Sequence, residues 1–378
     1  MAEFIFYTND DFISNEITGG TRRFRELVVG LMDKGHHIHL FVPSRANFPS
    51  HRNLTRHPVK RKKSRLLPNG LLNFISNYPR LRSIRRMKNS RPVFVSLHYA
   101  LQGWLAGVKK PVLIVWEDFI EYRKFNMEAR KFPPWLIGVV AAVLSWLEGL
   151  TLLHMQRIVL QCRYDREVLL RRHPRRANKL KQRMVILPNN VNPSWIKKKI
   201  PSPGVFVSSK ASSLHVGFIG NVDNRRKGLH LLLQAFERLL NDGKDARLHV
   251  IGSGRLLPQY KEKYNRSSFI FHGYRPEPLE QISGFDLLVV PSLADSFPNT
   301  IMEALYLGVP VLGARTGGIP EMLLYDELLF EPRPDDLYGK LTKTIGEGSL
   351  EYLGELCLRR REAFWFDWPD AMEKKLLE

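Results

Sequence analysis

Cysteine is scarce in this chain, and acidic residues are missing from one long stretch of it. Only Cys162 and Cys357 occur among 378 residues. Two cysteines exclude a disulfide framework and a four-cysteine zinc site, and they are typical of a reducing compartment. The first ten residues hold Glu3, Asp10 and no Lys or Arg, so we expect no secretory signal. An apolar content of 44% excludes disordered and collagen-like classes, and the length is typical of about two domains.

No Asp or Glu occurs between Asp33 and Glu117, a stretch that contains 17 Lys or Arg residues. Residues 1–200 hold 37 basic and 13 acidic residues, whereas residues 201–378 hold 21 and 24. The formal net charge of +21 therefore arises entirely in the first half. Such a field attracts polyanions, which include nucleic acid, an anionic membrane and a negatively charged acceptor. We expect the two halves of the chain to have different functions.

Short apolar runs alternate with helical patterns from the start of the chain. The first such unit is a strand, a Gly-Gly turn, a helix and a second strand, an arrangement that builds parallel sheets. The strands predicted for the first half are Phe4–Tyr7, His37–Val42, Val93–Leu97, Val112–Trp116, Ile158–Leu160 and Met184–Leu187, with a helix at about 22–34.

The same rhythm restarts after a segment rich in Pro, Gly and Ser, which is the composition of a linker. We predict an α/β fold with two doubly wound, Rossmann-like domains that face each other across a cleft. Their ligand is then expected at the carboxyl ends of the strands. The predicted parts are a first domain at 1–195, a linker at 196–213, a second domain at 214–350 and a C-terminal helix at 351–378. In the second domain we predict strands His215–Ile219, Arg247–Ile251, Phe269–His272, Leu287–Val290 and Pro310–Gly313, and helices Gly228–Leu240 and Thr300–Leu307.

The segment 134–153 is apolar and carries one charge, Glu148. About 20 such residues are long enough to cross a bilayer. Three features argue against a membrane span: Glu148 inside the segment, His154 and Arg157 directly after it, and the strand Ile158–Leu160, which must join the first sheet. We therefore expect a helix that is chiefly buried in the core, or one that partly faces a membrane.

Three consecutive cations, Arg225, Arg226 and Lys227, follow a strand and a Gly-containing turn in HVGFIGNVDNRRKG. Cations at a helix start oppose the helix dipole unless an anion lies among them. A diphosphate is the natural anion, and a solvated basic turn is the alternative.

A second cluster lies in PSLADSFPNTIMEALYLGVPVLGARTGGIPEML, where Asp295 and Glu303 bracket a helix start near Thr300. The first-turn N–H groups of a helix bind anions, and a carboxylate such as Glu303 accepts hydrogen bonds from ribose hydroxyls. Gly317 and Gly318 let the backbone approach a ligand closely. Helix capping is the alternative for each carboxylate.

These segments occur in a familiar order. Five segments resemble, in sequence and in order, those of the retaining GT-B-fold glycosyltransferases of family 4 (glycosyltransferase group 1). They are FIGNVDNRRKGLHLLLQAF, HVIGSG, FHGY, the FPNTIMEAL segment and GVPVLGARTGGIPE. GGTRRFRELVVGLMDKGHHIHLF resembles the Gly-Gly opening of that family, VILPNNVNPSWI its domain-crossing segment, and FWFDWPDAMEKKLLE its final helix, which returns to the first domain.

The resemblance implies a nucleotide-diphosphate sugar donor on the second domain, an acceptor on the first, retention of anomeric configuration, and neither metal nor cofactor. It assigns Lys227 and Arg226 to the diphosphate and Glu303 to the ribose. The Gly19–Gly20 loop would close over the diphosphate. The donor-binding residues implied are Gly19, Gly20, Asn221, Arg225, Arg226, Lys227, Gly252, Tyr274, Arg275, Asp295, Pro298, Asn299, Thr300 and Glu303, and the catalytic ones are Lys227, Asp295, Arg226 and Glu117.

Three positions depart from the family pattern. Asn221 stands where the family usually has Arg, and Arg225 is the candidate to replace that charge. Asp295 is one methylene shorter than the usual Glu. Glu117 follows a strand whose end carries a sugar-contacting His in many members of the family, so Glu117 is a candidate to contact the acceptor. His98, after an earlier strand, is the second acceptor-side candidate, and a structural role is the alternative for it.

The basic segment 66–91 interleaves apolar positions such as Leu71, Ile75 and Tyr78 with cations, five of which lie at 80–88. Pro79 is expected to begin a second short helix. Apolar positions flanked by cations are typical of an interfacial helix, although a helix packed on the sheet gives the same pattern. We expect peripheral attachment to the inner face of the cytoplasmic membrane and a lipid-linked or anionic cell-envelope glycan as acceptor. A sugar-nucleotide epimerase of the same fold and a basic nucleic-acid-binding protein remain alternatives; the second lacks a zinc spacing or a recognition helix.

Overall fold

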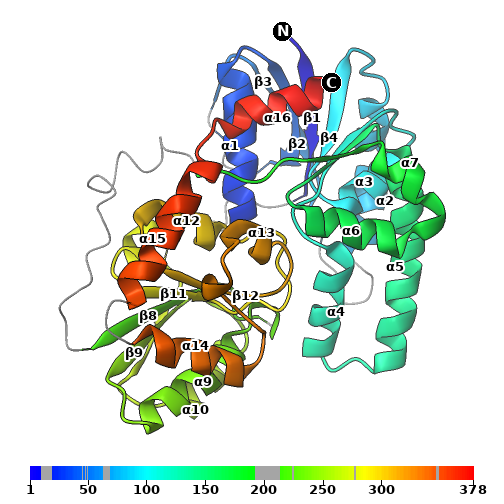
Figure 1. Cartoon of the computed structure of the whole chain (residues 1–378). Coiled ribbons are helices and arrows are strands. Elements are labelled where there is room, and N and C mark those ends of the chain that lie inside the picture. Colours follow the sequence, from blue (N-terminus) through cyan, green and yellow to red (C-terminus); the bar gives the residue numbers. More distant parts are fainter. Residues whose placement is uncertain are drawn as a thin grey trace. The chain divides into compact units, whose positions relative to one another are not determined.

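The computed structural model describes residues 1–9, 19–44, 46, 48, 50–62, 69–191, 213–223, 225–275, 278–345 and 349–378 (Figure 1). Two compact units make up the chain. Unit 1 comprises Met1–Ile120, Gly138–Leu187 and Trp368–Glu378, and unit 2 comprises Glu121–Ile137 and Pro188–Asp367. Apart from Ser213, the predicted linker at 196–213 lies outside the described residues.

Unit 1 is built on a seven-stranded sheet in the order β3-β2-β1-β4-β5-β6-β7. Every neighbouring pair in it is parallel. Its apolar strands are buried on both faces, as parallel strands covered by helices must be. The strands are β1 (Glu3–Tyr7), β2 (His37–Pro43), β3 (Leu54–Val59), β4 (Ser90–Phe94), β5 (Val112–Ile114), β6 (Arg157–Leu160) and β7 (Met184–Ile186).

The helices of the first half alternate with these strands. In the first one, Phe24, Leu27 and Leu31 recur at helical spacing and are buried. The helical elements are α1 (Gly19–Asp33), α2 (Asn69–Ile84), α3 (Leu97–Leu105), α4 (Phe119–Ala129), α5 (Pro134–His154), α6 (Arg163–Arg172), η1 (Pro174–Arg176) and α7 (Ala177–Lys181).

Unit 2 repeats the scheme with six parallel strands in the order β10-β9-β8-β11-β12-β13. The strands are β8 (Leu214–Ile219), β9 (Ala246–Ile251), β10 (Phe269–Gly273), β11 (Leu287–Val290), β12 (Val311–Ala314) and β13 (Leu329–Phe330). The helical elements are η2 (Arg225–Lys227), α9 (Leu229–Asn241), α10 (Leu257–Lys263), α11 (Pro278–Ile282), α12 (Asn299–Leu307), α13 (Ile319–Leu323), η3 (Asp326–Leu328), α14 (Pro334–Thr344), α15 (Ser349–Arg361) and η4 (Glu362–Phe364). The predicted α/β fold with two parallel sheets is confirmed.

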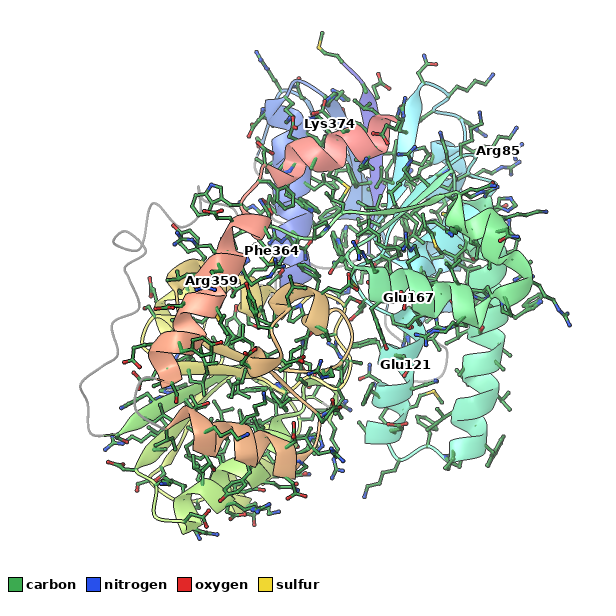
Figure 2. The ribbon with its side chains drawn as sticks, in the orientation of Figure 1. Arg85, Glu121, Glu167, Arg359, Phe364 and Lys374 are labelled. Carbon is green, nitrogen blue, oxygen red and sulfur yellow. The ribbon has the colours of Figure 1, made fainter. Side chains whose placement is uncertain are left out.

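The last segment of the chain divides between the units. Phe364, labelled in Figure 2, packs on Phe297 of unit 2 with ring centroids 5.7 Å apart. The helix α16 (Trp368–Leu377) instead lies along α1 in unit 1 (Figure 1). Lys34 Nζ binds Asp370 Oδ1 at 2.6 Å, and the Trp368 side chain is fully buried. The final helix is thus a structural part of the first unit.

Several predicted element bounds were wrong. The Gly19–Gly20 pair is not a loop, because it forms the first residues of α1. The strand β4 ends at Phe94 and α3 begins at Leu97, so His98 lies in a helix. The predicted second short helix does not exist, since α2 continues through Pro79. The edge strand β3 was not predicted; its Pro58 is tolerated because an edge strand has one unpaired side.

Of the two alternatives for 134–153, the helix chiefly buried in the core was wrong, and the one that partly faces a membrane stays a prediction. Helix α5 covers this segment, and only 28% of its most apolar 18 residues are buried. It is the one helix among the described residues that is long and apolar enough to cross a membrane. Its Glu148 is buried, and both carboxylate oxygens accept hydrogen bonds from Arg172 Nη1, at 3.0 and 2.9 Å. The second half of α5 is therefore fixed to unit 1.

Candidate active site

The strongest candidate site lies in unit 2, where loops leave the carboxyl ends of β8, β9, β11 and β12. The turn 225–227 follows β8, and the loop 291–298 follows β11, which is the neighbouring strand in the sheet. Adjacent parallel strands end at the same sheet edge, so these loops meet there. The structure brings together in this way the two segments that the sequence singled out.

Lys227 and Asp295 connect the two loops directly. The Lys227 ammonium donates to the Asp295 carboxylate, and both side chains are largely shielded from solvent, with 23% and 12% exposed. Arg226 holds the same loop through its backbone oxygen, which accepts from Leu293 N at 2.7 Å, and through its guanidinium, which donates to Ala294 O at 3.1 Å. The predicted basic pair and the predicted carboxylate therefore form one connected group.

Two glycines allow this close approach. Gly228 has φ +70°, and a Cβ there would lie 1.7 Å from Pro291 O. Gly317 has φ +57°, and a Cβ there would lie 1.9 Å from Asp295 O, which also accepts from Gly318 N at 3.1 Å. Only glycine fits either position. The loop that carries Asp295 is held from both sides, so its carboxylate is positioned by backbone contacts.

Helix α12 begins at this loop. Pro298 is its N-cap, and no side chain caps it, so first-turn amides are available at Asn299 and Thr300. Asn299 Oδ1 accepts from Asn189 Nδ2 at 3.3 Å, an interaction within unit 2. Glu303 lies one turn further along and is buried, with 7% exposed. The predicted residues Pro298, Asn299, Thr300 and Glu303 therefore share one helix end.

Asn221, which replaces the expected Arg, serves the loop that contains it. Its amide donates to Asp223 Oδ2 at 3.1 Å, and its Oδ1 accepts from Asp223 N at 2.7 Å. Asp223 also accepts from Arg255 N at 3.2 Å. Neither Asp223 nor Arg255 was predicted as part of the site. The Gly-rich turn GSGR, which follows β9, was the available signal, and only its Gly252 was predicted as a site residue.

Arg225 is exposed and acts on two neighbouring side chains that the sequence reading missed. Burial, with a further contribution from the positive charge of Arg225, lowers the pKa of His230 to about 4. Burial raises the pKa of Tyr260, an effect that Arg225 opposes. At neutral pH His230 is therefore uncharged, and the positive charge at this end of α9 comes from Arg225, Arg226 and Lys227.

The remaining predicted donor residues lie at the ends of β9 and β10. Gly252 N donates to Gly273 O at 2.8 Å, which joins the two strand ends beside Tyr274 and Arg275. Tyr274 is half-buried, whereas Arg275 is exposed. Both residues thus lie at the carboxyl edge of the same sheet as Lys227.

The other predicted residues belong to unit 1 and lie at the carboxyl edge of its own sheet. A Cβ on Gly20 would lie 3.7 Å from Trp116 Cε3, so the start of α1 borders the loop after β5. The exposed Glu117 follows directly in that loop. Gly19, Gly20 and Glu117 are therefore neighbours in unit 1.

His98 lies near the same loop. Its Nδ1 is 2.7 Å from Ser96 Oγ, and its ring stacks on Phe119 with centroids 5.8 Å apart. Tyr99 is closer still, at 3.7 Å between centroids. The half-buried ring is held on several sides, which favours the structural role for His98 and leaves Glu117 as the more accessible group.

The arrangement in unit 2 suits an anion that bears a diphosphate. Positioned cations and a free helix N-terminus stabilise negative charge that develops in a reaction. The buried Glu303 adds an acceptor for hydroxyl groups. Among the described residues, no cluster of three or more His, Cys, Asp or Glu side chains is arranged to hold a metal ion.

Comparison with known protein families gives two matches. Residues 17–195 match the family described as Glycosyltransferase Family 4, and residues 213–347 match the one described as Glycosyl transferases group 1. An uncharacterized glycosyltransferase of Methanocaldococcus jannaschii, MJ1059, is 28% identical over 161 residues, which cover 40% of this chain and 36% of that protein. The matched region spans about a third of the length of the first curated relatives.

Two solved structures share the fold over the whole chain. One is WaaG, a glycosyltransferase involved in lipopolysaccharide biosynthesis, with a TM-score of 0.70 at 16% identity, covering 100% of this chain and 98% of that one. The other is HepE of Anabaena in complex with UDP-glucose, with a TM-score of 0.66 at 14% identity and the same coverage.

Proposed function

Because this chain belongs to the group 1 glycosyltransferases of family 4 and has their GT-B fold, we propose that it transfers a sugar from a nucleotide-diphosphate sugar to an acceptor. The observation that carries the proposal is the connected group Lys227–Asp295–Arg226 at the N-terminal end of α12. The transfer would retain the anomeric configuration and use no metal.

The reaction breaks the bond between the sugar C1 and the diphosphate, and negative charge grows on the departing oxygen. Lys227, Arg226 and the first-turn amides of α12 would lie around that oxygen and stabilise the transition state more than the bound donor. Glu303 would accept hydrogen bonds from the ribose. Asp295 would keep the Lys227 ammonium at the sheet edge, and Glu117 would orient the acceptor.

The acceptor is proposed from the charge of the chain. The first half holds 37 basic and 13 acidic residues, which favours a lipid-linked or anionic cell-envelope glycan at a cytoplasmic membrane surface. WaaG acts in lipopolysaccharide biosynthesis, which accords with this class of acceptor. UDP-glucose, the ligand of HepE, is the first donor to test.

A thermal-shift screen of nucleoside diphosphates and their sugars tests donor binding, because a ligand raises stability in proportion to ln(1 + [L]/Kd). With the donor identified, Lys227→Ala should lower kcat by about 100–1000-fold, the usual cost of losing one donor to a developing oxyanion. Lys244→Ala is the matched control, since Lys244 is an exposed lysine of the same unit.

Activity of the Lys227→Ala variant equal to that of the wild type would refute the proposed role of the lysine. Incubation of the donor without acceptor is the second arm. An isomerised sugar nucleotide as the product would identify an epimerase and refute the transferase.

A further inference from the structure

Helix α5 presents an apolar stripe to solvent along its first four turns. Trp135 is 70% exposed and Trp146 60%, and Val139 and Val143 lie between them at 54% and 52%. Gly138 and Ala142 complete the exposed set. A stripe with two tryptophans this exposed is unusual for a protein surface.

These positions form one continuous face. At 3.6 residues per turn, residues 135, 139, 142 and 146 fall within about 60° of one another around the helix. Trp135 and Trp146 are separated by about 16 Å along the axis. The stripe therefore suits a flat surface that runs parallel to the helix.

The same helix is not built to cross a bilayer. Glu148 is buried, and it accepts from Arg172 Nη1 and lies 2.8 Å from His173 Nε2. Arg172 also donates to Asp118 in the loop before α4. These contacts fix α5 to unit 1 from Glu148 onward and leave the residues before it, 134–147, for a partner.

The turn that precedes the stripe supplies positive charge. Arg130 and Lys131 are exposed there, and Lys131, with φ +59°, ends α4 through hydrogen bonds from Lys131 N to Glu128 O and from Phe132 N to Met127 O. No charged residue occurs from 132 to 147. Residues 121–131 hold four cations against two acids, so the end of the stripe is net positive.

We propose that α5 lies flat in the interface of an anionic bilayer, with Trp135 and Trp146 at the headgroup level and Arg130 and Lys131 on lipid phosphates. Tryptophan favours that depth because its ring is apolar and its N–H is polar. A basic first half and an uncharged stripe are complementary to the headgroups and the acyl boundary of such a membrane. The inference extends the peripheral attachment proposed above and names the element that inserts.

Helix α2 has a supporting role in this arrangement. Its Leu71, Ile75 and Tyr78 are exposed at 49%, 60% and 39%, as the predicted interfacial pattern requires. Its Leu81 and Ile84 are buried, and Arg85, labelled in Figure 2, follows the helix. The apolar anchor is α5, because its exposed stripe is longer and carries both tryptophans.

The first test compares Trp135→Ser/Trp146→Ser with the wild type in co-sedimentation on mixed phosphatidylcholine–phosphatidylglycerol vesicles. The double variant should bind about tenfold or more weakly, because inserted apolar area sets the affinity. The matched control is Trp365→Ser, which removes a tryptophan of unit 2 that is 44% exposed. The double variant should keep the melting temperature of the wild type without vesicles, since the residues replaced on α5 are exposed. Unchanged binding by the double variant would overturn the proposal.

The second test places an environment-sensitive fluorophore on Val139→Cys, with Tyr352→Cys as the control. Both native cysteines are buried and will not be labelled, so each variant reports one position. Emission from position 139 should shift to the blue on anionic vesicles, and that from position 352 should not. In a third variant the label is placed on Val143→Cys. Nitroxide lipids should quench the labels at 139 and 143 from the same shallow depth. A deep position for both would indicate a span and would refute the flat orientation.

Two further outcomes would distinguish this proposal from a stripe that binds another protein and from a failure of the proposed transferase function. If Trp135→Ser/Trp146→Ser converts a dimer to a monomer in buffer and leaves vesicle binding unchanged, the stripe binds a second copy of this chain, and the proposal fails. Donor binding by the same variants is measured by thermal shift without vesicles. Loss of vesicle binding with intact donor binding supports the anchor, whereas failure of every sugar nucleotide to bind the wild type refutes the transferase and leaves the vesicle result standing.

Discussion

Replacing Arg172 by Met removes the cation that joins two carboxylates in unit 1. Arg172 donates to Glu148 and Asp118, whose side chains are 4% and 21% exposed. Burial by itself lowers the pKa of the Arg172 guanidinium, but the charges of Glu148 and Asp118 outweigh it and raise that pKa above its usual value. The variant leaves Glu148 as a buried carboxylate with only His173 as the partner described above.

Breaking a buried ion pair from one side costs about 3–5 kcal/mol. For a unit of this size that loss lowers the melting temperature by roughly 6–20 °C. The double variant Arg172→Met/Glu148→Leu removes both charges and should recover most of the loss, because an apolar pair of similar volume replaces the ion pair. Urea denaturation of the wild type, both single variants and the double variant measures the coupling free energy.

Arg238→Met is the control for this experiment. Arg238 pairs with Asp335 at the surface of unit 2, where the two side chains are 51% and 87% exposed. Exposed pairs contribute about 0–1 kcal/mol. The reasoning is refuted if Arg172→Met stays within about 1 kcal/mol of the wild type, or if Arg238→Met costs as much.

Three further predictions concern stability. Gly228→Ala should cost about 1–3 kcal/mol more in urea denaturation than Gly243→Ala, because both sites have positive φ but only the first Cβ meets backbone, at Pro291 O. The pKa of His249 is lowered from its usual 6.5 to about 4 by burial and by the positive charges of His215, His272 and Arg247. The stability that the uncharged His249 contributes is therefore complete above pH 6.5 and is lost as the pH falls toward 4. His249→Gln should flatten this pH dependence of the melting temperature. Trp368→Ala should cost about 3–5 kcal/mol by the same denaturation assay, since the side chain is fully buried; a cost below 1 kcal/mol would exclude α16 from the core.

The parallel strands could be predicted because each is a short apolar run bounded by polar turns. Residues 287–290 were predicted with the observed bounds, and α9 was predicted within one residue of its observed ends because its leucines recur at helical spacing. The strand β3 was missed because Arg56, His57 and Pro58 interrupt any apolar run, which an edge position allows. Edge strands carry little of the hydrophobic signal that identifies a central strand.

The site was predictable as a set of loops, while its internal contacts were not. The sequence placed Lys227 and Asp295 in the two loops that meet, but their hydrogen bond depends on Gly228 and Gly317, whose partners lie far away in the chain. The role of Asn221 in its own turn also needed coordinates. The burial of 134–153 was misjudged because an apolar helix has the same composition whether protein or lipid covers it.

The position of α16 has a consequence for the order in which the protein forms during synthesis. Domains usually fold in sequence as they leave the ribosome. Here Trp368 and the partners of Lys34 belong to the first unit but are translated after the whole of the second. The face of α1 that α16 covers therefore stays exposed to solvent until the second unit has been synthesised. Chaperones that bind nascent chains can bind to that face throughout this period.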